Sequence, residues 1–144
     1  MKQYDAIIIG FGKAGKTLAA ELSNRGWQVA VVERSSMMYG GTCPNIACIP
    51  TKTLVHEAGI AALLYHDNYP KQANLYKQAI GRKNRLTSFL RNNNYERLSK
   101  RPNVTVYTGE GSFVSANIIK DQVSNYTKKE PFEAMCEVKA LAYA

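Results

Sequence analysis

Two cysteines five residues apart, Cys43 and Cys48, are the side chains of this chain best suited to redox chemistry. They lie in residues 40–52, which read Gly-Gly-Thr-Cys-Pro-Asn-Ile-Ala-Cys-Ile-Pro-Thr-Lys. A disulfide needs Cα atoms within about 7 Å of each other. Five residues of regular helix rise about 7.5 Å. The two cysteines therefore cannot form a bridge inside one undistorted helix.

Pro44 fits the start of a helix because it has no backbone N–H that would be left unpaired there. We therefore expect Cys43 in a loop and Cys48 at or inside the first turn of a helix that runs through Lys52 toward Tyr65. The N-terminus of that helix would favour a thiolate at Cys48, which is the nucleophilic form. For this spacing alone, two unpaired thiols and a static bridge stay open as alternatives.

A metal site is not expected at these cysteines. Cysteine ligands of structural zinc are usually separated by about two to four residues and joined by a second ligand pair. His56, His66 and Cys136 supply no such pair. Cys136 is expected to be an incidental thiol.

The elements that would position the cysteines begin near the start of the chain. Residues 4–9 are an apolar, β-branched run, residues 16–25 have helical periodicity, and residues 28–32 read as a second strand that ends in Glu33. The segment 10–15, Gly-Phe-Gly-Lys-Ala-Gly, joins the first strand to the helix. This order of elements is typical of an α/β domain with a parallel sheet.

The glycines of this segment match a dinucleotide-binding turn. Gly10 permits the tight turn, Gly12 lets the backbone approach a pyrophosphate, and Gly15 allows close packing of the helix. Glu33 follows Gly15 by eighteen residues, where a carboxylate would accept hydrogen bonds from an adenosine ribose. The pattern predicts a dinucleotide site.

A competing motif overlaps the glycine turn. Residues 10–17 also satisfy the phosphate loop of nucleoside triphosphatases, with Lys16 and Thr17 in the positions of the phosphate-binding lysine and the magnesium-binding hydroxyl. Such enzymes also need an aspartate for magnesium. Only Asp121 closely follows apolar residues. A phosphate-loop protein therefore stays an alternative to the dinucleotide site.

Together these motifs resemble a known family. The glycine turn, Glu33 and Gly41-Thr42-Cys43-x4-Cys48-x-Pro50-Thr51-Lys52 are similar to the amino-terminal part of the class I pyridine nucleotide-disulfide oxidoreductases, which include dihydrolipoyl dehydrogenase, glutathione reductase and mercuric reductase. The resemblance covers about residues 2–113 and is closest to the branch linked to reactive chlorine and hypothiocyanous acid resistance. It implies a Rossmann-like FAD-binding domain with three layers and a parallel sheet, here incomplete.

The resemblance also implies roles for single residues. Cys43 matches the interchange thiol that meets substrate, and Cys48 matches the thiol that exchanges electrons with the flavin. Lys52 matches the lysine near the flavin N5 edge, and Gly111 would contact the adenine from the strand and turn of residues 104–113. The FAD-binding residues expected on this basis are Gly10, Gly12, Ala14, Gly15, Glu33, Arg34, Gly41, Thr42, Lys52 and Gly111.

The segment that carries Gly111 has an alternative interpretation. Residues 104–113 alone could be an ordinary hairpin with glycine at its turn. Residues 114–123 could form a further strand pair.

The resemblance implies an enzyme that passes electrons from NAD(P)H through FAD to a Cys43–Cys48 disulfide and on to a small oxidised substrate, as a homodimer. A chain of 144 residues has room for one ordinary domain, so the nicotinamide and interface domains would be absent or come from another polypeptide. We expect residues 1–127 to be the N-terminal part of the FAD domain. Residues 128–144 read as an atypical tail whose end does not resemble the family's closing strand. A truncated product is the hypothesis, and a non-catalytic FAD-binding remnant is the alternative.

The composition fits a globular protein, with 45% hydrophobic residues and a mean hydropathy of −0.31. No stretch approaches the roughly 18 apolar residues of a membrane span. The start of the chain lacks the pattern of a signal peptide, which favours the cytoplasm. No membrane partner is expected.

The positive charge is concentrated in residues 71–101, which hold nine Lys and Arg against the single acid Glu96. Apolar residues recur there at roughly helical spacing, so we expect one or two long amphipathic helices with a basic, solvated face. Since no recognised nucleic-acid module accompanies the charge, no nucleic-acid partner is expected.

Overall fold

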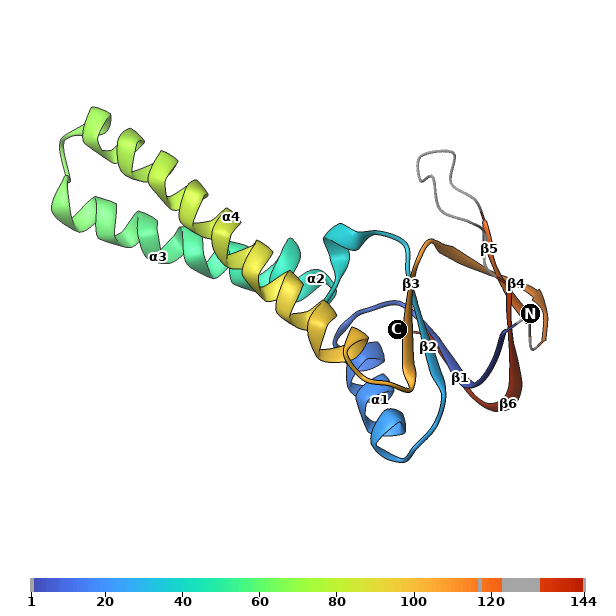
Figure 1. Ribbon diagram of the computed structural model, residues 1–144. Coiled ribbons are helices and arrows are strands. Elements are labelled where there is room, and N and C mark those ends of the chain that lie inside the picture. Colours follow the sequence, from blue (N-terminus) through green and yellow to red (C-terminus); the bar gives the residue numbers. More distant parts are fainter. Residues whose placement is uncertain (1, 117, 123–132, 144) are drawn as a thin grey trace.

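The computed structural model describes residues 2–116, 118–122 and 133–143 (Figure 1). In chain order its elements are β1 (Lys2–Ile9), α1 (Lys13–Asn24), β2 (Val29–Glu33), the 3-10 helix η1 (Ser36–Met38), α2 (Thr42–Asn45), α3 (Cys48–Leu64), α4 (Tyr69–Ser99), β3 (Val104–Thr108), β4 (Glu110–Ser115), β5 (Ile118–Gln122) and β6 (Glu133–Tyr143). Figure 1 shows a body that contains the sheet and α1, and an arm of α3 and α4 that projects from it.

The sheet has the strand order β3-β2-β1-β6-β5-β4. Its first four strands are parallel, and β6, β5 and β4 pair antiparallel with one another. Parallel neighbours need a crossover connection. Helix α1 connects β1 to β2, and the arm connects β2 to β3. The expected α/β class with a Rossmann-like parallel sheet is confirmed.

Residues 6–8 of β1 and 29–32 of β2 are continuous apolar runs because both faces of the sheet are covered there. On one face, α1 and the end of α4 pack against the strands. On the other, Ile119 of β5 packs against β1 and β2, so the β5–β4 end of the sheet, a hairpin, folds over this face. The helix-side core consists mainly of Ala6, Ile8, Phe11, Ala19, Leu22, Val29, Val31, Tyr39, Leu98 and Val104, and the hairpin-side core consists of Tyr4, Ile7, Ala30, Val32 and Ile119.

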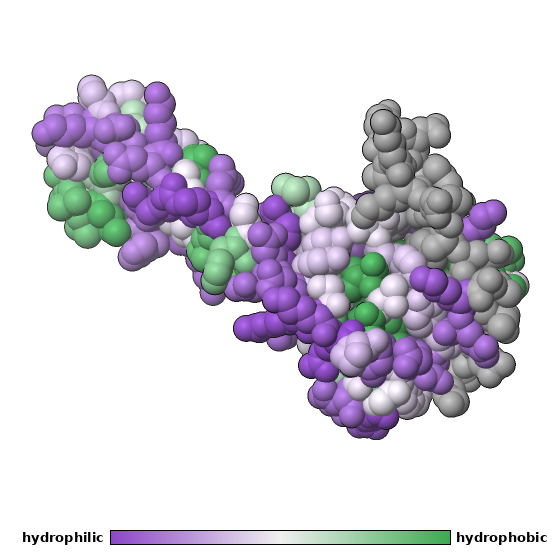
Figure 2. Space-filling view, in the orientation of Figure 1, coloured by the Kyte–Doolittle hydropathy of each residue, from purple (hydrophilic) through white to green (hydrophobic). Residues whose placement is uncertain are grey.

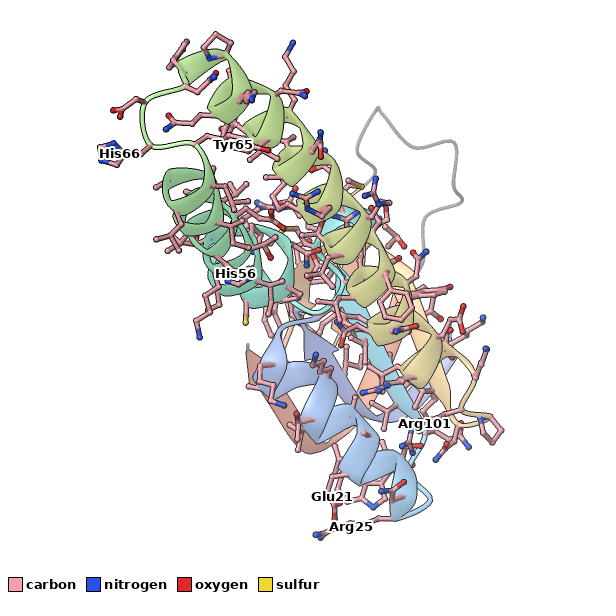
Figure 3. All side chains as sticks on the ribbon, turned by 90° about the vertical axis from the view of Figure 1, so that its left-hand side faces the viewer. Glu21, Arg25, His56, Tyr65, His66 and Arg101 are labelled. Carbon is pink, nitrogen blue, oxygen red and sulfur yellow. The ribbon has the colours of Figure 1, made fainter. Side chains whose placement is uncertain are left out.

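The arm is a pair of helices joined at its tip (Figure 1). Arg82 of α4 donates two hydrogen bonds to the carboxylate of Glu57 on α3, one of them 2.7 Å long. At the base of α4, Arg101 donates to Asn24 Oδ1 at 2.7 Å, and Figure 3 shows Arg101 beside α1. Figure 2 shows hydrophilic residues along much of the arm and a hydrophobic patch at its tip. The arm is therefore tied to the body at one end and extends away from it at the other.

Most elements expected from the sequence are present. The strand over 4–9, the following helix and the strand that ends in Glu33 are confirmed, and the basic segment forms one helix, α4, rather than two. The strands β3 and β4 do not form a hairpin with each other, because β3 pairs with β2 and β4 pairs with β5. The strand pair expected in residues 114–123 is present in part, as β5 paired with β4.

The end of the chain forms a strand that was not predicted from the sequence. Glu133–Tyr143 is β6 and pairs in parallel with β1. That these residues do not resemble the family's closing strand stays a prediction. An edge strand leaves a row of backbone donors and acceptors unpaired, so β1 accepts a neighbour through its backbone whatever side chains that neighbour carries. The boundary at residue 127 stays a prediction.

Among the described residues, no helix is long and apolar enough to cross a bilayer.

Candidate cofactor and redox site

The turn after β1 leaves open space at the N-terminus of α1. Gly10 has φ 105°, a conformation that favours glycine, and its N–H donates to Val32 O at 2.7 Å. Gly12 is the N-cap of α1, and a Cβ added there would meet no atom within 4 Å. The first N–H groups of a helix lack partners within the helix and attract anions. The space at Gly12 therefore fits a pyrophosphate.

Glu33 at the end of β2 is held in place by two backbone N–H groups. Its carboxylate accepts hydrogen bonds from Phe11 N at 2.9 Å and from Ser35 N at 3.1 Å. A carboxylate has about four lone-pair positions, so it can also accept from ribose hydroxyls. The carboxylate is therefore oriented and still able to bind.

Two adjoining hollows follow the carboxyl ends of the strands. They share three lining residues, Gly10, Glu33 and Arg34. The first hollow, beside the hairpin, is lined by Ile9, Gly10, Val32, Glu33, Arg34, Gly109, Glu110 and Gly111. The second, beside the cysteine segment, is lined by Gly10, Phe11, Gly12, Lys13, Glu33, Arg34, Met38, Gly40, Gly41, Thr42 and Cys43. Together they lead from β4 to Cys43.

Glycine at two positions lets backbone segments approach around these hollows. A Cβ on Gly111 would lie 3.1 Å from Val32 Cγ1, so glycine there lets β4 lie close to β2. Gly41 has φ 79°, and a Cβ on it would lie 2.7 Å from the Cα of Gly12. The cysteine segment and the glycine turn thus touch through backbone.

The two cysteines lie on separate helices. Cys48 is the first residue of α3, as predicted, but Cys43 lies in the four-residue helix α2 rather than in a loop. A break in the helix between Asn45 and Cys48 lets the two thiols approach, which an undistorted helix would prevent. Both cysteines are free and exposed. The hydrogen bond with the Cys48 thiol raises the pKa of Cys43, and the positive charges of Lys16 and Lys52 act in the opposite direction.

Lys52 lies four residues after Cys48, so both project from the same face of α3. It is exposed, and its charge reaches the Cys43 thiol. In the first turn of α1, Ala14 is exposed and Gly15 is buried, which agrees with close packing of that helix at Gly15.

Four residues that line the second hollow were not predicted from the sequence: Phe11, Lys13, Met38 and Gly40. Phe11 and Lys13 occupy variable positions of the glycine motif, so their place in the turn was a signal that could have identified them. Gly40 opens the cysteine segment of residues 40–52, and Met38 lies two residues before it, so their place beside the cysteines was a signal for both.

The phosphate-loop alternative has no support in the side chains. Lys16 Nζ donates to Asn94 Oδ1 on α4 at 2.5 Å, and burial lowers the pKa of Lys16. Thr17 Oγ1 donates to Lys13 O, four residues earlier in its own helix, at 2.7 Å. Neither group is directed to a shared phosphate and magnesium site.

The two histidines lie outside the two hollows. Figure 3 shows His66 at the tip of the arm and His56 along α3. Both are exposed, and neither lines the two hollows.

Comparison with known proteins gives one consistent match. The family model described as "Pyridine nucleotide-disulphide oxidoreductase" matches residues 4–133. A probable pyridine nucleotide-disulfide oxidoreductase RclA from Escherichia coli (strain K12) is 48% identical over 120 residues, which cover 83% of this chain and 24% of that protein. A dihydrolipoyl dehydrogenase from Trypanosoma brucei brucei is 33% identical over 131 residues, covering 81% of this chain and 25% of that protein.

Solved structures agree. The Cu(II) complex of HOCl-induced flavoprotein disulfide reductase RclA from Escherichia coli has a TM-score of 0.82 and 40% identity, covering 100% of this chain and 29% of that one. The chain thus spans about a quarter of the length of the relatives it matches.

Proposed function

The chain belongs to the pyridine nucleotide-disulphide oxidoreductase family, and on that premise we propose that it binds FAD and carries a redox-active disulfide between Cys43 and Cys48. The observation that carries this proposal is the pair of adjoining hollows, which share Gly10, Glu33 and Arg34 and end at Cys43. A dinucleotide extended along them would place its far end beside the redox-active thiols.

Each part of the cofactor has residues that fit it. The wall formed by Arg34 and Gly111 would contact the adenine, and the carboxylate of Glu33 would accept from the ribose hydroxyls. The open space at Gly12 would take the pyrophosphate at the N-terminus of α1, whose first turn contains Ala14 and Gly15.

The flavin end would lie near Gly41, Thr42 and Lys52. The first two line the hollow that ends at Cys43, and the charge of Lys52 reaches the same thiol. FAD supplies the electron pair that reduces the disulfide. A cation at Lys52 would stabilise negative charge at this end of the site.

In this proposal the two cysteines alternate between a disulfide and two thiols, and each turn of the cycle transfers two electrons. Reduction of the bridge breaks the S–S bond, takes up two electrons and two protons, and leaves both thiols. Cys43 then passes this reducing equivalent to an oxidised small molecule, and the Cys43–Cys48 bond forms again as that molecule takes two electrons and two protons. A reduced nicotinamide cofactor replaces the electrons.

The remaining features of the proposed enzyme depend on parts of the relatives that this chain does not cover. We propose a homodimer that uses NAD(P)H and acts in the cytoplasm, where thiols stay reduced. One relative is described as an HOCl-induced flavoprotein disulfide reductase, which supports an oxidised small molecule as the substrate.

The proposal is tested by counting FAD per polypeptide in the desalted chain and in Gly12→Leu. Gly12 has φ −72°, so leucine fits its backbone, but the new side chain would occupy the space proposed for the pyrophosphate. Gly59→Leu is the matched control, because a Cβ there also meets nothing within 4 Å but lies on the arm. We expect near-stoichiometric FAD in the wild type and in the control, and at least about a tenfold weaker affinity in Gly12→Leu, because a side chain in the cradle displaces a phosphate contact. Failure of the wild type to retain FAD, or equal affinity in all three, would contradict the proposal.

A further inference from the structure

Helix α4 contacts the segment that carries Cys43, although the two lie about fifty residues apart in sequence. Three residues one turn apart or adjacent on α4 make these contacts: Arg91, Asn94 and Tyr95. None of them lines the hollows proposed for FAD. Most of their contacts fall on residues 37–45, which include the short helix α2 and are named here the redox loop. Asn94 also contacts Lys16 and Leu90.

Arg91 orients the amide that braces the redox loop. Its Nε donates to Asn45 Oδ1 at 2.9 Å. This fixes the Asn45 amide, whose Nδ2 donates to Gly41 O at 2.7 Å and to Tyr39 O at 3.1 Å. Arg91 also donates to Met37 Sδ at 3.4 Å. The guanidinium thus holds both ends of the redox loop.

Asn94 fills the space beside Gly40. A Cβ on Gly40 would overlap the Nδ2 of Asn94, so the two residues are packed as closely as glycine allows. The Asn94 amide is oriented by donating to Leu90 O at 2.8 Å, and its Oδ1 accepts from Lys16 Nζ at 2.5 Å. Asn94 therefore connects the redox loop to Lys16 on α1, a residue that the FAD site does not use.

Tyr95 supports the redox loop from the same side. Its ring stacks on Tyr39 with centroids 4.8 Å apart, and Tyr39 in turn contacts Phe11 of the glycine turn at 5.1 Å. The Tyr39 hydroxyl lies 2.5 Å from Thr108 Oγ1 on β3. The redox loop is thus fixed against the sheet and the glycine turn as well as against α4.

We propose that Arg91 and Asn94 are positioning residues that hold the redox loop so that Cys43 lies within bridging distance of Cys48. They act through Asn45, Gly40 and Lys16 and touch neither thiol. This proposal rests on the proposed function, because it assigns the positioning of the same cysteine pair. Asn94 also fixes the ammonium group of Lys16. The positive charge of that group acts to lower the pKa of Cys43, which agrees with this positioning role.

The test compares Arg91→Gln and Asn94→Ala with the wild type, using the full chain. Arg85→Gln is the matched control, because Arg85 is an exposed arginine of the same helix and its loss changes the charge equally. Two quantities are measured: the equilibrium constant for forming the Cys43–Cys48 disulfide in a glutathione buffer, and hydrogen exchange of the backbone amides in residues 39–45. Circular dichroism checks that each variant is folded.

We expect Arg91→Gln to lower the equilibrium constant about tenfold, because a charge-assisted hydrogen bond that positions the loop is lost and the effective concentration of the two thiols falls. Exchange in residues 39–45 should rise by a similar factor, and Asn94→Ala should move both quantities in the same direction. Arg85→Gln should match the wild type. Arg91→Lys should recover part of the effect, since lysine restores the charge but not the planar fork.

The outcomes separate this inference from the proposed function. A wild type that forms the disulfide, with unchanged exchange and equilibrium in Arg91→Gln, would overturn the positioning role alone. A wild type that never forms the disulfide would refute the redox proposal, and the exchange of residues 39–45 would still decide whether Arg91 and Asn94 hold the loop. If Arg91→Gln is unfolded, the same comparison with Asn94→Ala decides.

Discussion

In the body, β1 and β2 are buried on both faces, whereas in the arm α3 and α4 bury only small or partial surfaces. Ile7 and Val31 in the body are 0% exposed, while Leu63 in the arm is 87% exposed. The two helices of the arm are joined by the ion pair of Arg82 with Glu57. A groove lined mostly by apolar residues lies between them. The body therefore has the core of a self-supporting unit, and the arm depends on its base.

The proposed chemistry lies where these two regions meet. Cys48 begins the arm, while Cys43 lies at the end of a hollow whose other walls belong to the body and to the redox loop. The redox loop between the regions is held by backbone contact at Gly41 and by side chains of α4. A rigid body can thus present the cofactor while the base of the arm presents the thiols.

The largest difference between body and arm is expected for a matched pair of leucines. Leu22 on α1 is 8% exposed and packs in the helix-side core, whereas Leu63 on α3 is 87% exposed. Leu22→Ala should lower the free energy of unfolding by about 3 kcal/mol through lost burial and a cavity. Leu63→Ala should change it by less than about 0.5 kcal/mol. Urea denaturation of both variants measures this, and equal effects would contradict the division into body and arm.

A matched pair of glycines tests the junction. At Gly41 a Cβ would collide with the backbone of Gly12, and φ is 79°, so Gly41→Ala should cost about 1–3 kcal/mol and weaken FAD binding. Gly59 lies inside α3 with free space around it, so Gly59→Ala should stabilise the chain by about 0.5–1 kcal/mol. Thermal unfolding and FAD titration report both. A Gly41→Ala variant as stable as the wild type would show that the redox loop does not rest on the glycine turn.

The smallest effect is expected for the ion pair of the arm. The hydrogen bond from Arg82 holds the pKa of Glu57 below its ordinary value of 4.5. A lowered carboxyl pKa stabilises the folded arm above the ordinary value, and this stabilisation is lost as the pH falls through the lowered pKa. Helical content should therefore decline on acidification below pH 4.5 in the wild type, and Glu57→Gln should lack this part of the decline. Identical pH profiles in the wild type and Glu57→Gln would show that the ion pair does not stabilise the arm.

The sequence alone could predict the features that depend on local pattern. The strand, glycine turn, helix and acid of residues 4–33 were predicted because their spacing reflects one local folding unit. The start of α3 at Cys48 followed from helix geometry and Pro44. The order of the motifs was enough to predict the α/β class.

The features that the sequence could not predict depend on distant contacts. Arg91 and Asn94 lie in a long basic helix with no motif, and only the fold brings them to the redox loop. Strand β6 was missed because its place is set by the open edge of β1 rather than by its own side chains. The short helix at Cys43 follows from contacts of Asn45 with the preceding carbonyls, which the printed order of residues does not reveal.

The most direct test of the joint cofactor and redox site is an anaerobic dithionite titration of the FAD-loaded chain, with Cys43→Ser as the control. FAD and a disulfide each accept two electrons. We expect the oxidised wild type to take up twice as many electrons per flavin as Cys43→Ser, and both proteins to retain FAD equally. Equal uptake in the two proteins, or a chain that retains no FAD, would contradict it.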